Sequence, residues 1–500
     1  MSLMGVDVGT TGAKAVVFAL DGAVLAQAYR EYPLYHPQPG WSELNPNEVM
    51  EAVKEVIASA AQQASDPVRA IGISCQGEAV TPLDAQGNVI FNSPISFDLR
   101  SVPQARYLEE KLGKRRIFDI TGHSVSSIYT MCKLMWLREN EPEVWNRARK
   151  FYCYEEMVMH VLGVEPRIDY SLAARTLGFD VIKLRWSREM LGAAEVPVEN
   201  LPPVAAPGID CGKVAARVAD ELGLRRDVVV ATGAHDQPAT ALGAGVIEPN
   251  IGVDGTGTVE CFTVAFAEPV LTDRMLECQF PCYNHALPQM YCTLAWNFTG
   301  GILLRWFRDN FADEEKRIAA EQGRDVYDVM LERATPGPVD CLVLPHFTMT
   351  GTPLFDNQAR GAIVGLTLDH TKADLLKAVL DGITFELKYN LALLEQAGVP
   401  VQRLRATGGG AKSPLWLQLK ADIFNKPIEV PTSSEGSCLG AAICAGVACG
   451  EYRNHREGVQ ACIDIHAAYE PRADMAAAYE EKFALYRQIY PALKDLHHAM

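Results

Sequence analysis

The sequence has 500 residues, with 46 basic and 62 acidic residues, and its net charge of −16 argues against a large interface with a nucleic-acid backbone. Its hydrophobic content of 48% fits a globular protein, and because it shows neither a signal-peptide pattern nor an apolar run of bilayer length, we expect a cytoplasmic protein that binds no membrane. The 13 cysteines show no C-x-x-C pair and no zinc-ligand spacing, which indicates reduced core residues.

The first predicted element is a hairpin between Leu3 and Phe18, LMGVDVGTTGAKAVVF. Two apolar runs flank a Gly/Thr turn, which is the pattern of strand, tight turn, strand. Thr10 and Thr11 supply hydroxyl groups, the glycines let backbone N–H groups approach an anion, and Lys14 adds a positive charge. Asp7 is a candidate ligand for a hydrated magnesium ion. These features favour a polyphosphate site, and an ordinary hairpin with polar turn residues is the alternative.

Two polar groups follow predicted strands in the first half of the chain. The buried strand 70–74 runs into Gln76, Gly77 and Glu78, a position where α/β folds usually bind ligands. Gln76 and Glu78 can each bond hydroxyls of a sugar or polyol, and a solvated turn is the alternative. Asp98 either lines the same pocket or forms a structural ion pair with Arg100, and we favour the ion pair.

A catalytic candidate follows the predicted strand 227–232. The chain there reads Gly-Ala-His-Asp-Gln-Pro, and a small-residue helix is expected from Ala239. Asp236 near a helix N-terminus is either a cap or the base of a phosphoryl transfer, whose loose transition state needs only an acceptor for the hydroxyl proton. The strand-to-helix context favours the catalytic role, and we expect the helix N-terminus to keep Asp236 ionised. His235 is interpreted as a packing or hydrogen-bonding residue.

The segment 252–264, GVDGTGTVECFTV, repeats the pattern of the first hairpin. Two matching hairpins about half a chain apart predict two related domains, 1–247 and 248–500, each offering a phosphate-binding turn to a cleft between them. Neither turn opens directly into a helix, so Walker A and dinucleotide-binding loops fit poorly.

Further along, leucines at three- and four-residue spacing predict a long core helix over 372–397. The predicted strand 404–407 then ends in three glycines before a helix over 414–424. A strand-to-helix turn without side chains leaves room for an adenine base, and Ser413 is placed to bond to that base.

With these motifs the chain resembles the FGGY family of carbohydrate kinases over nearly its whole length. The motifs are DVGTTGAK from Asp7, GAHDQ around Asp236, GTGT from Gly255, NQARGAIVGLT, the triple glycine, and LGAA after Glu435. The resemblance implies an α/β fold of two ribonuclease-H-like domains of the actin and hexokinase type with a central cleft. It also implies binding of magnesium-ATP and transfer of the γ-phosphoryl group to a hydroxyl of a sugar or polyol.

The same resemblance assigns site residues. Asp236 is the expected base, and Asp7 is the residue expected to bind Mg2+. The expected nucleotide contacts are Thr10, Thr11, Lys14, Gly255, Thr256, Gly301, Gly409, Gly410 and Ser413. The expected acceptor contacts are Gln76, Gly77, Glu78, Asp98 and Gln237.

The acceptor is predicted from the residues at 77 and 78. Xylulokinases of the family usually carry Met-His there and glycerol kinases carry Arg-Glu, whereas this chain has Gly77 and Glu78. Glu78 and Gln237 are similar to the glycerol kinase residues, but the aromatic expected near Ile128 is displaced to Tyr129. Because Gly77 is expected to open space, we predict an acceptor larger than glycerol. The general similarity to xylulokinase-like members implies a ketopentose such as xylulose or a related sugar or polyol.

The competing hypothesis is a nucleotide-dependent binding or regulatory protein of the same fold that does not phosphorylate sugar. The expected partners are ATP and a small sugar or polyol, and homodimer formation is left open. Because exclusion of water protects ATP from hydrolysis, closure of the two domains around the ligands is expected.

Overall fold

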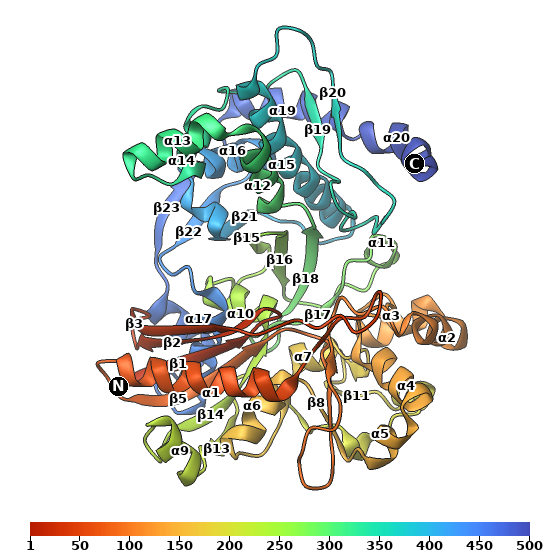
Figure 1. Ribbon diagram of the computed structural model, residues 1–500, viewed down its shortest axis with the longest axis vertical. Helices are drawn as coiled ribbons and strands as arrows, with labels where there is room; N and C mark the ends of the chain where they lie inside the picture. Colours follow the sequence, from red (N-terminus) through yellow and green to blue (C-terminus); the bar gives the residue numbers. More distant parts are fainter.

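Two mixed β-sheets form the frame of the structure, a computed structural model that describes all 500 residues (Figure 1). The lower sheet in this view has the strand order β13-β14-β5-β1-β2-β3, and the upper sheet has the order β17-β18-β16-β15-β21-β22-β23. The strands of the lower sheet are β1 (Ser2–Val8), β2 (Gly12–Ala19), β3 (Val24–Glu31), β5 (Val68–Cys75), β13 (Asp210–Lys213) and β14 (Val229–His235). The strands of the upper sheet are β15 (Ile251–Thr256), β16 (Glu260–Phe266), β17 (Tyr283–Asn284), β18 (Tyr291–Asn297), β21 (Arg403–Gly408), β22 (Ile428–Pro431) and β23 (Ile465–Tyr469).

The two predicted hairpins lie within these two sheets. In the lower sheet, β1 and β2 pair antiparallel with Asp7 opposite Lys14, and β1 runs parallel to β5. In the upper sheet, β15 and β16 pair antiparallel, and β15 runs parallel to β21. The arrangement of a hairpin beside a parallel strand therefore occurs twice, which confirms the repeat inferred from the sequence.

Three parallel strands of the lower sheet end at the same edge. Asp7 is the last residue but one of β1. Gln76 directly follows β5, and Asp236 directly follows β14. Because β5 pairs with both β1 and β14 in parallel, these distant parts of the sequence meet there. Open α/β sheets bind ligands at this edge, beyond the carboxyl ends of their strands.

The helices pack around the sheets. α1 (Pro46–Gln63) covers β2 and β3, and the side chain of Asn45 caps it by accepting from the backbone N–H of Asn47. The long predicted helix is α15 (Lys372–Gln396), which begins with a capping box of Thr371 and Asp374 and lies in the core of the upper lobe. The other upper helices are α11 (Asp273–Glu277), α12 (Gly301–Phe311), α13 (Asp313–Gln322), α14 (Val326–Glu332), α16 (Pro414–Phe424), α19 (Ala473–Tyr486) and α20 (Ile489–Ala499), with a 3-10 turn over Gly409–Lys412.

The lower lobe carries an additional helical layer, which Figure 1 shows on its right. Besides α1, α10 and α17, the helices of the lower lobe are α2 (Val102–Leu112), α3 (Lys114–Thr121), α4 (Thr130–Asn140), α5 (Pro142–Arg147), α6 (Tyr154–Leu162), α7 (Tyr170–Ala174), α8 (Arg188–Ala194) and α9 (Ala216–Leu222). Short strand pairs complete the fold: β4 (Glu43–Leu44) with β7 (Ser93–Pro94), β6 (Thr81–Leu83) with β8 (Lys150–Tyr152), β9 (Ile168–Asp169) with β12 (Val204–Ala205), β10 (Phe179–Asp180) with β11 (Arg185–Trp186), and β19 (Leu342–Leu344) with β20 (Ala362–Val364).

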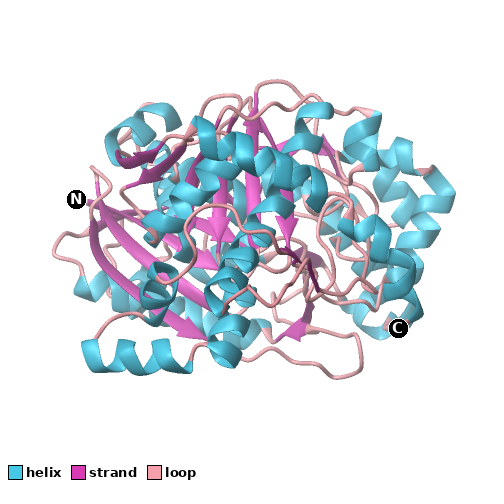
Figure 2. Cartoon of the chain, turned by 90° about the horizontal axis from the view of Figure 1, so that it is seen from above, coloured by secondary structure: helices cyan, strands magenta, loops and turns pink.

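Two small-residue helices join the lobes. α17 (Gly436–Ala448) lies late in the sequence but packs on β1, β5 and β14 of the lower sheet, and α10 (Asp236–Gly243) packs along it. The contact is at backbone distance, since a Cβ added to Gly440 would lie 2.0 Å from the carbonyl oxygen of Ala239. Both helices are visible between the sheets in Figure 1, and Figure 2 shows the molecule from above with helices over both sheets.

The architecture is the expected α/β type with two lobes built on one repeated unit. None of the helices combines the length and the apolar character needed to cross a bilayer. All 13 cysteines are free, and 11 of them are buried, as the sequence analysis expected for core residues. The domain boundary between 247 and 248 stays a prediction.

Candidate active site

Two carboxylates come together at the ends of β1 and β14. The Oδ1 atom of Asp7 accepts a hydrogen bond of 2.8 Å from the hydroxyl of Ser74, and burial raises the pKa of Asp7. Burial, followed by the charges of Asp7 and Glu78, raises the pKa of Asp236 to about 7. The motif-based expectation that Asp7 and Asp236 share one site agrees with this electrostatic coupling.

The expectation that a helix N-terminus keeps Asp236 ionised needs correction. α10 begins at Asp236 itself, three residues earlier than expected, so the helix dipole does act on this carboxyl group. Burial and the nearby carboxylates of Asp7 and Glu78 nevertheless have the larger effect, because they raise the pKa of Asp236 far above the ordinary aspartate value. Asp236 is therefore a stronger proton acceptor than the sequence indicated.

His235 lies beside the same carboxyl group. Its Nε2 atom lies 3.1 Å from Oδ1 of Asp236, and its Nδ1 atom lies 3.2 Å from the hydroxyl of Tyr283. Burial lowers the pKa of His235, so the ring is neutral. If the neutral ring accepts a hydrogen bond from Tyr283 at Nδ1, its proton is on Nε2, the ring nitrogen nearer Asp236, while Oδ1 of Asp236 itself makes no hydrogen bond in the structure. The contacts agree with the hydrogen-bonding role expected for His235.

Glu78 is held by a network that the sequence did not reveal. Its carboxylate pairs with Arg175 and accepts a hydrogen bond from Ser96. Its backbone carbonyl accepts hydrogen bonds of 3.0 Å from Thr130 and from the buried ammonium of Lys133. The residue has φ of 67°, which is unusual for a residue with a side chain and common at functional sites.

Arg175 is the main residue that sequence reasoning missed. It is buried, its guanidinium packs against the rings of Tyr129 and Tyr283, and its charge acts on Asp236 by lowering the pKa. Arg175 follows α7 and is 97 residues from Glu78 in sequence, so only the tertiary structure reveals the pair.

The space expected at Gly77 is filled. A Cβ at this position would lie 3.0 Å from the ring of His235 and 3.3 Å from Cβ of Arg175. A side chain at this position would press on the imidazole that lies beside Asp236, and glycine leaves room for that ring. The inference that Gly77 enlarges the acceptor site was wrong, because His235 takes that volume.

Gln76 and Asp98 make structural contacts. The amide of Gln76 donates to the carbonyl of Gly9 at 3.0 Å and accepts from the hydroxyl of Thr10 at 3.2 Å, so it braces the first turn. Asp98 is fully buried and bonds to the guanidinium of Arg100 and to the backbone N–H of Ser42. The ion-pair alternative thus describes Asp98, and the expectation of an acceptor contact is corrected.

The remaining residues expected at the acceptor and first turn are accessible. Gln237 is half-buried, and its Oε1 atom accepts a hydrogen bond of 3.4 Å from Thr263. Thr10 is half-buried and Thr11 is exposed in the turn between β1 and β2. The ammonium of Lys14, also half-buried, pairs with Glu435 at the start of α17.

The turn between β15 and β16 packs against two other glycine-containing segments. The backbone N–H of Gly301 donates to the carbonyl of Gly257 at 2.9 Å. A Cβ at Gly410 would lie 2.6 Å from Cβ of Thr256. The structure thus brings Gly255, Thr256, Gly301, Gly409 and Gly410 into one region, with Gly255 half-buried and Gly409 exposed.

Two expected nucleotide contacts have their hydroxyl groups engaged. The hydroxyl of Thr256 is buried, accepts a hydrogen bond from Lys420 and donates one to Glu260. Only the backbone of Thr256 is therefore left to contact a nucleotide. The Ser413 hydroxyl caps α16 by accepting from the backbone N–H of Trp416 at 3.3 Å. Ser413 itself is half-buried.

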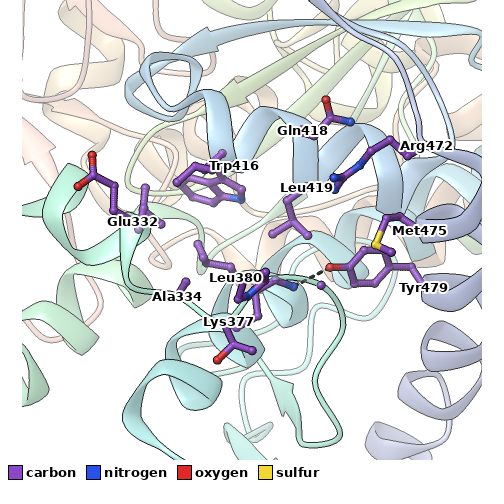
Figure 3. Close-up of a pocket in the computed structure, with 15 residues that line it drawn as sticks. Glu332, Ala334, Lys377, Leu380, Trp416, Gln418, Leu419, Arg472, Met475 and Tyr479 are labelled. Atoms are coloured by element: carbon purple, nitrogen blue, oxygen red, sulfur yellow. Dashed lines mark hydrogen bonds between the residues drawn. The ribbon is translucent and has the colours of Figure 1, made fainter.

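A cavity of about 480 Å³ lies elsewhere, between α14, α15, α16 and α19 (Figure 3). Trp416 and Tyr479 are among the residues that line it, and the ammonium of Lys377 donates to the hydroxyl of Tyr479 at 2.7 Å within it. None of the residues expected to contact ATP or sugar lines this cavity. It is therefore separate from the carboxylates at the edge of the lower sheet.

The two-lobed fold, with one Gly/Thr turn from each sheet and a carboxylate pair beside the first, is the fold of sugar kinases of the actin and hexokinase type. Residues 2–243 match the N-terminal domain of the FGGY family of carbohydrate kinases, and residues 255–449 match its C-terminal domain. The chain belongs to this family, and it is a phosphotransferase that acts on a carbohydrate.

The chain is similar to several named members of the family. It is 30% identical to a xylulose kinase of Staphylococcus epidermidis, over 99% of this chain and 97% of the relative. It is 29% identical to a gluconokinase of Bacillus subtilis, over 99% of this chain and 96% of the relative. The crystal structure of ligand-bound xylulose kinase from Lactobacillus acidophilus superposes with a TM-score of 0.89 at 27% identity, covering 99% of this chain and 98% of that one.

Proposed function

We propose that this kinase transfers the γ-phosphoryl group of magnesium-ATP to a hydroxyl of a ketopentose such as xylulose. The observation that carries the proposal is the place of Asp236, at the end of β14 between the Gly/Thr turn of β1–β2 and the Glu78–Arg175 pair. Asp236 orients the acceptor hydroxyl and takes its proton as the phosphoryl group is transferred.

The charges of the site favour a neutral sugar over a sugar acid. Relatives at nearly equal identity include xylulose kinases and a gluconokinase, so overall similarity does not separate the two acceptors. Arg175 is paired with Glu78, and Lys14 is paired with Glu435. Beside the carboxylates of Asp7 and Asp236, neither cation is left to balance the carboxylate of a gluconate-like acceptor.

The nucleotide roles follow the two turns. We assign Thr10, Thr11 and Lys14 to the phosphates from the lower lobe. From the upper lobe, the backbone at Gly255 and Thr256 faces the phosphates. The nucleoside contacts in this proposal are Gly301, Gly409, Gly410 and Ser413, which lie around the same turn.

The residues at the edge of the lower sheet fit a magnesium ion delivered with ATP. The structure has no group of three or more His, Cys, Asp or Glu side chains arranged as a metal site. Mg2+ does not require one, because it takes most of its ligands from water and phosphate oxygens and adds one or two carboxylates. Asp7 is the residue that would hold it, and the bound ion would supply neutralisation of the phosphoryl charge.

Asp236→Asn tests the assignment, with Asp313→Asn on an exposed helix as the control. ATP consumption is measured with ketoses, aldoses, polyols and sugar acids. We expect a ketopentose to be the best acceptor, and Asp236→Asn to lower kcat at least about 100-fold while Asp313→Asn leaves it unchanged. Full turnover in Asp236→Asn would refute the base. If ATP bound but no carbohydrate accelerated its consumption, a nucleotide-dependent binding protein would be the better description.

A further inference from the structure

A buried lysine lies beneath the turn that joins β15 and β16. Lys420 extends from α16, and its side chain is 1% exposed. Its ammonium donates hydrogen bonds to Oδ2 of Asp254 at 2.7 Å, to the hydroxyl of Thr256 at 2.6 Å, and to the carboxylate of Glu260. Asp254 and Glu260 are fully buried on the two strands of the hairpin.

The ammonium stays charged in this position. Burial alone would lower the pKa of Lys420, but the charges of Asp254 and Glu260 outweigh burial and raise the pKa. Its neighbours on α16 are apolar members of the upper core, among them Trp416 and Leu417. Replacing a whole buried ion network with well-packed apolar residues is often neutral or stabilising, so stability of the upper core alone does not require a lysine and two acids here.

The segments that Lys420 joins are the ones proposed to bind ATP. Thr256, which accepts from Lys420, touches the triple-glycine turn, because a Cβ at Gly408 would lie 2.5 Å from the carbonyl oxygen of Thr256. The same turn leads into α16, which carries Lys420. One ammonium thus connects both strands of the hairpin to the helix that follows the triple-glycine turn.

We infer that Lys420 is a positioning residue for the nucleotide, which acts through Thr256 and the β15–β16 turn to fix the phosphate-binding backbone relative to the triple-glycine turn. This inference rests on the proposed assignment of these turns to ATP. Its alternative is that Lys420 only stabilises the upper lobe. The two roles differ in whether ATP binding changes independently of stability.

A second buried lysine in the same lobe provides the control. Lys377 on α15 pairs with Asp381 and with the hydroxyl of Tyr479, beside the cavity of Figure 3. It has the same charge and is 7% exposed, but it contacts neither the β15–β16 turn nor the triple-glycine turn. Lys377→Met therefore reports the loss of a buried lysine pair without a change at the proposed nucleotide turns.

The test compares Lys420→Arg, Lys420→Met combined with Glu260→Gln, and Lys377→Met. Lys420→Met alone would leave Asp254 and Glu260 buried without their cation, so the double variant also removes the charge of Glu260 and leaves only Asp254 unpaired. Lys420→Arg keeps the positive charge and changes the geometry. Melting temperature, kcat, KM for ATP, KM for the sugar, and direct ATP binding by fluorescence titration are measured for each protein.

We expect both Lys420 variants to raise KM and Kd for ATP at least about tenfold and to change KM for the sugar less than about twofold. Lys377→Met is expected to lower the melting temperature and leave both ATP constants unchanged. Folded Lys420 variants with wild-type ATP affinity would overturn the inference, as would equal losses of ATP affinity in the Lys377 and Lys420 variants.

The proposed function and this inference fail in different ways. If the wild-type protein bound ATP but phosphorylated no sugar, the proposed function would fail and the titrations would still decide the role of Lys420. If the wild type phosphorylated a ketopentose and the Lys420 variants kept their ATP affinity, the inference alone would fail.

Discussion

At the scale of single residues, the chemistry is concentrated on Asp236. The carboxylates of Asp7 and Glu78 raise its pKa, Arg175 lowers it, and burial is the largest influence. A pKa of about 7 leaves the group partly ionised at neutral pH and makes it a far better proton acceptor than an exposed aspartate. The neighbours of Asp236 therefore tune the base as well as shape the site.

The first prediction is an acidic limb in the pH profile of kcat. Asp236 accepts a proton only when it is ionised, so activity is expected to rise with pH and level off above about 7. Below that pH, kcat should fall about tenfold per pH unit as the base becomes protonated. Steady-state rates at saturating ATP and sugar between about pH 5 and pH 9 check this. A profile that stays flat down to pH 5 would contradict a raised pKa.

The second prediction concerns Glu78→Gln. Removing this negative charge removes one cause of the raised pKa of Asp236, so the acidic limb of kcat is expected to move to lower pH. The change also leaves Arg175 without its carboxylate partner, so KM for the sugar should rise while KM for ATP stays constant. Glu189→Gln, at an exposed pair with Arg116, is the control. An unmoved limb would show that Glu78 does not act on Asp236.

Motifs located some of these residues and could not locate others. Asp7 and Asp236 were predicted because each ends a strand beside a recognisable glycine-containing segment. The role of Gly77 was misjudged, since the residue that fills its space, His235, comes from another strand. Arg175 was missed for the same reason, because a side-chain pair across 97 residues leaves no local pattern.

At the scale of elements, the crossing of α10 and α17 sets how the lobes meet. Glycine and alanine make up about half of α17, α10 has Ala239 and Gly243 among its buried residues, and the strands beneath also carry glycines where α17 crosses them. A Cβ at Gly72 of β5 would lie 1.9 Å from the carbonyl oxygen of Ala441. Because Asp236 is the first residue of α10, a shift of this crossing moves the proposed base directly.

The third prediction is that Gly440→Ala destabilises the protein by about 1–3 kcal/mol, because its Cβ would lie 2.0 Å from the carbonyl oxygen of Ala239. It should also lower kcat by moving α10. Gly192→Ala is the matched control, since this glycine lies in helix α8 with no atom within 4 Å of the added Cβ. That variant is expected to gain about 0.5–1 kcal/mol. Urea denaturation measures both, and equal effects would argue against tight packing at the crossing.

Elements were predicted well where their signals are local. Both Gly/Thr hairpins and α15 lie where turn residues and leucine spacing placed them. The place of α17 was not predictable, because its small residues fit any closely packed interface. Its packing on the sheet of the other half of the chain depends on glycines in β1 and β5, far away in sequence.

At the scale of the whole molecule, the acceptor and nucleotide sides are linked by both the chain and its contacts. Tyr283 belongs to the upper sheet, yet its hydroxyl lies 3.2 Å from Nδ1 of His235 in the lower lobe. The chain passes from α10 to β15 through Gly245, which has φ of 75° and lies against Arg405 of β21. If the lobes move relative to each other, the backbone at Gly245 and the contact between Tyr283 and His235 are the places that must change.

The last prediction is that the lobes close when ATP and sugar are both bound, because exclusion of water directs the phosphoryl group to the sugar hydroxyl. Small-angle scattering is expected to show a smaller radius of gyration with a non-hydrolysable ATP analogue and sugar than with either ligand alone. Gly245→Val should reduce this compaction, because a β-branched residue resists a φ of 75° and its Cβ would lie 2.2 Å from Nη1 of Arg405. The same variant should consume more ATP per sugar phosphate formed, since incomplete closure admits water to the transferred group.

Gly450→Val, at a positive φ of 80° but with no atom within 4 Å of the added Cβ, is the control for backbone strain alone. Equal compaction with one ligand and with two would mean that a single ligand is enough to close the lobes, and an unchanged radius of gyration in every liganded state would mean that the lobes do not close.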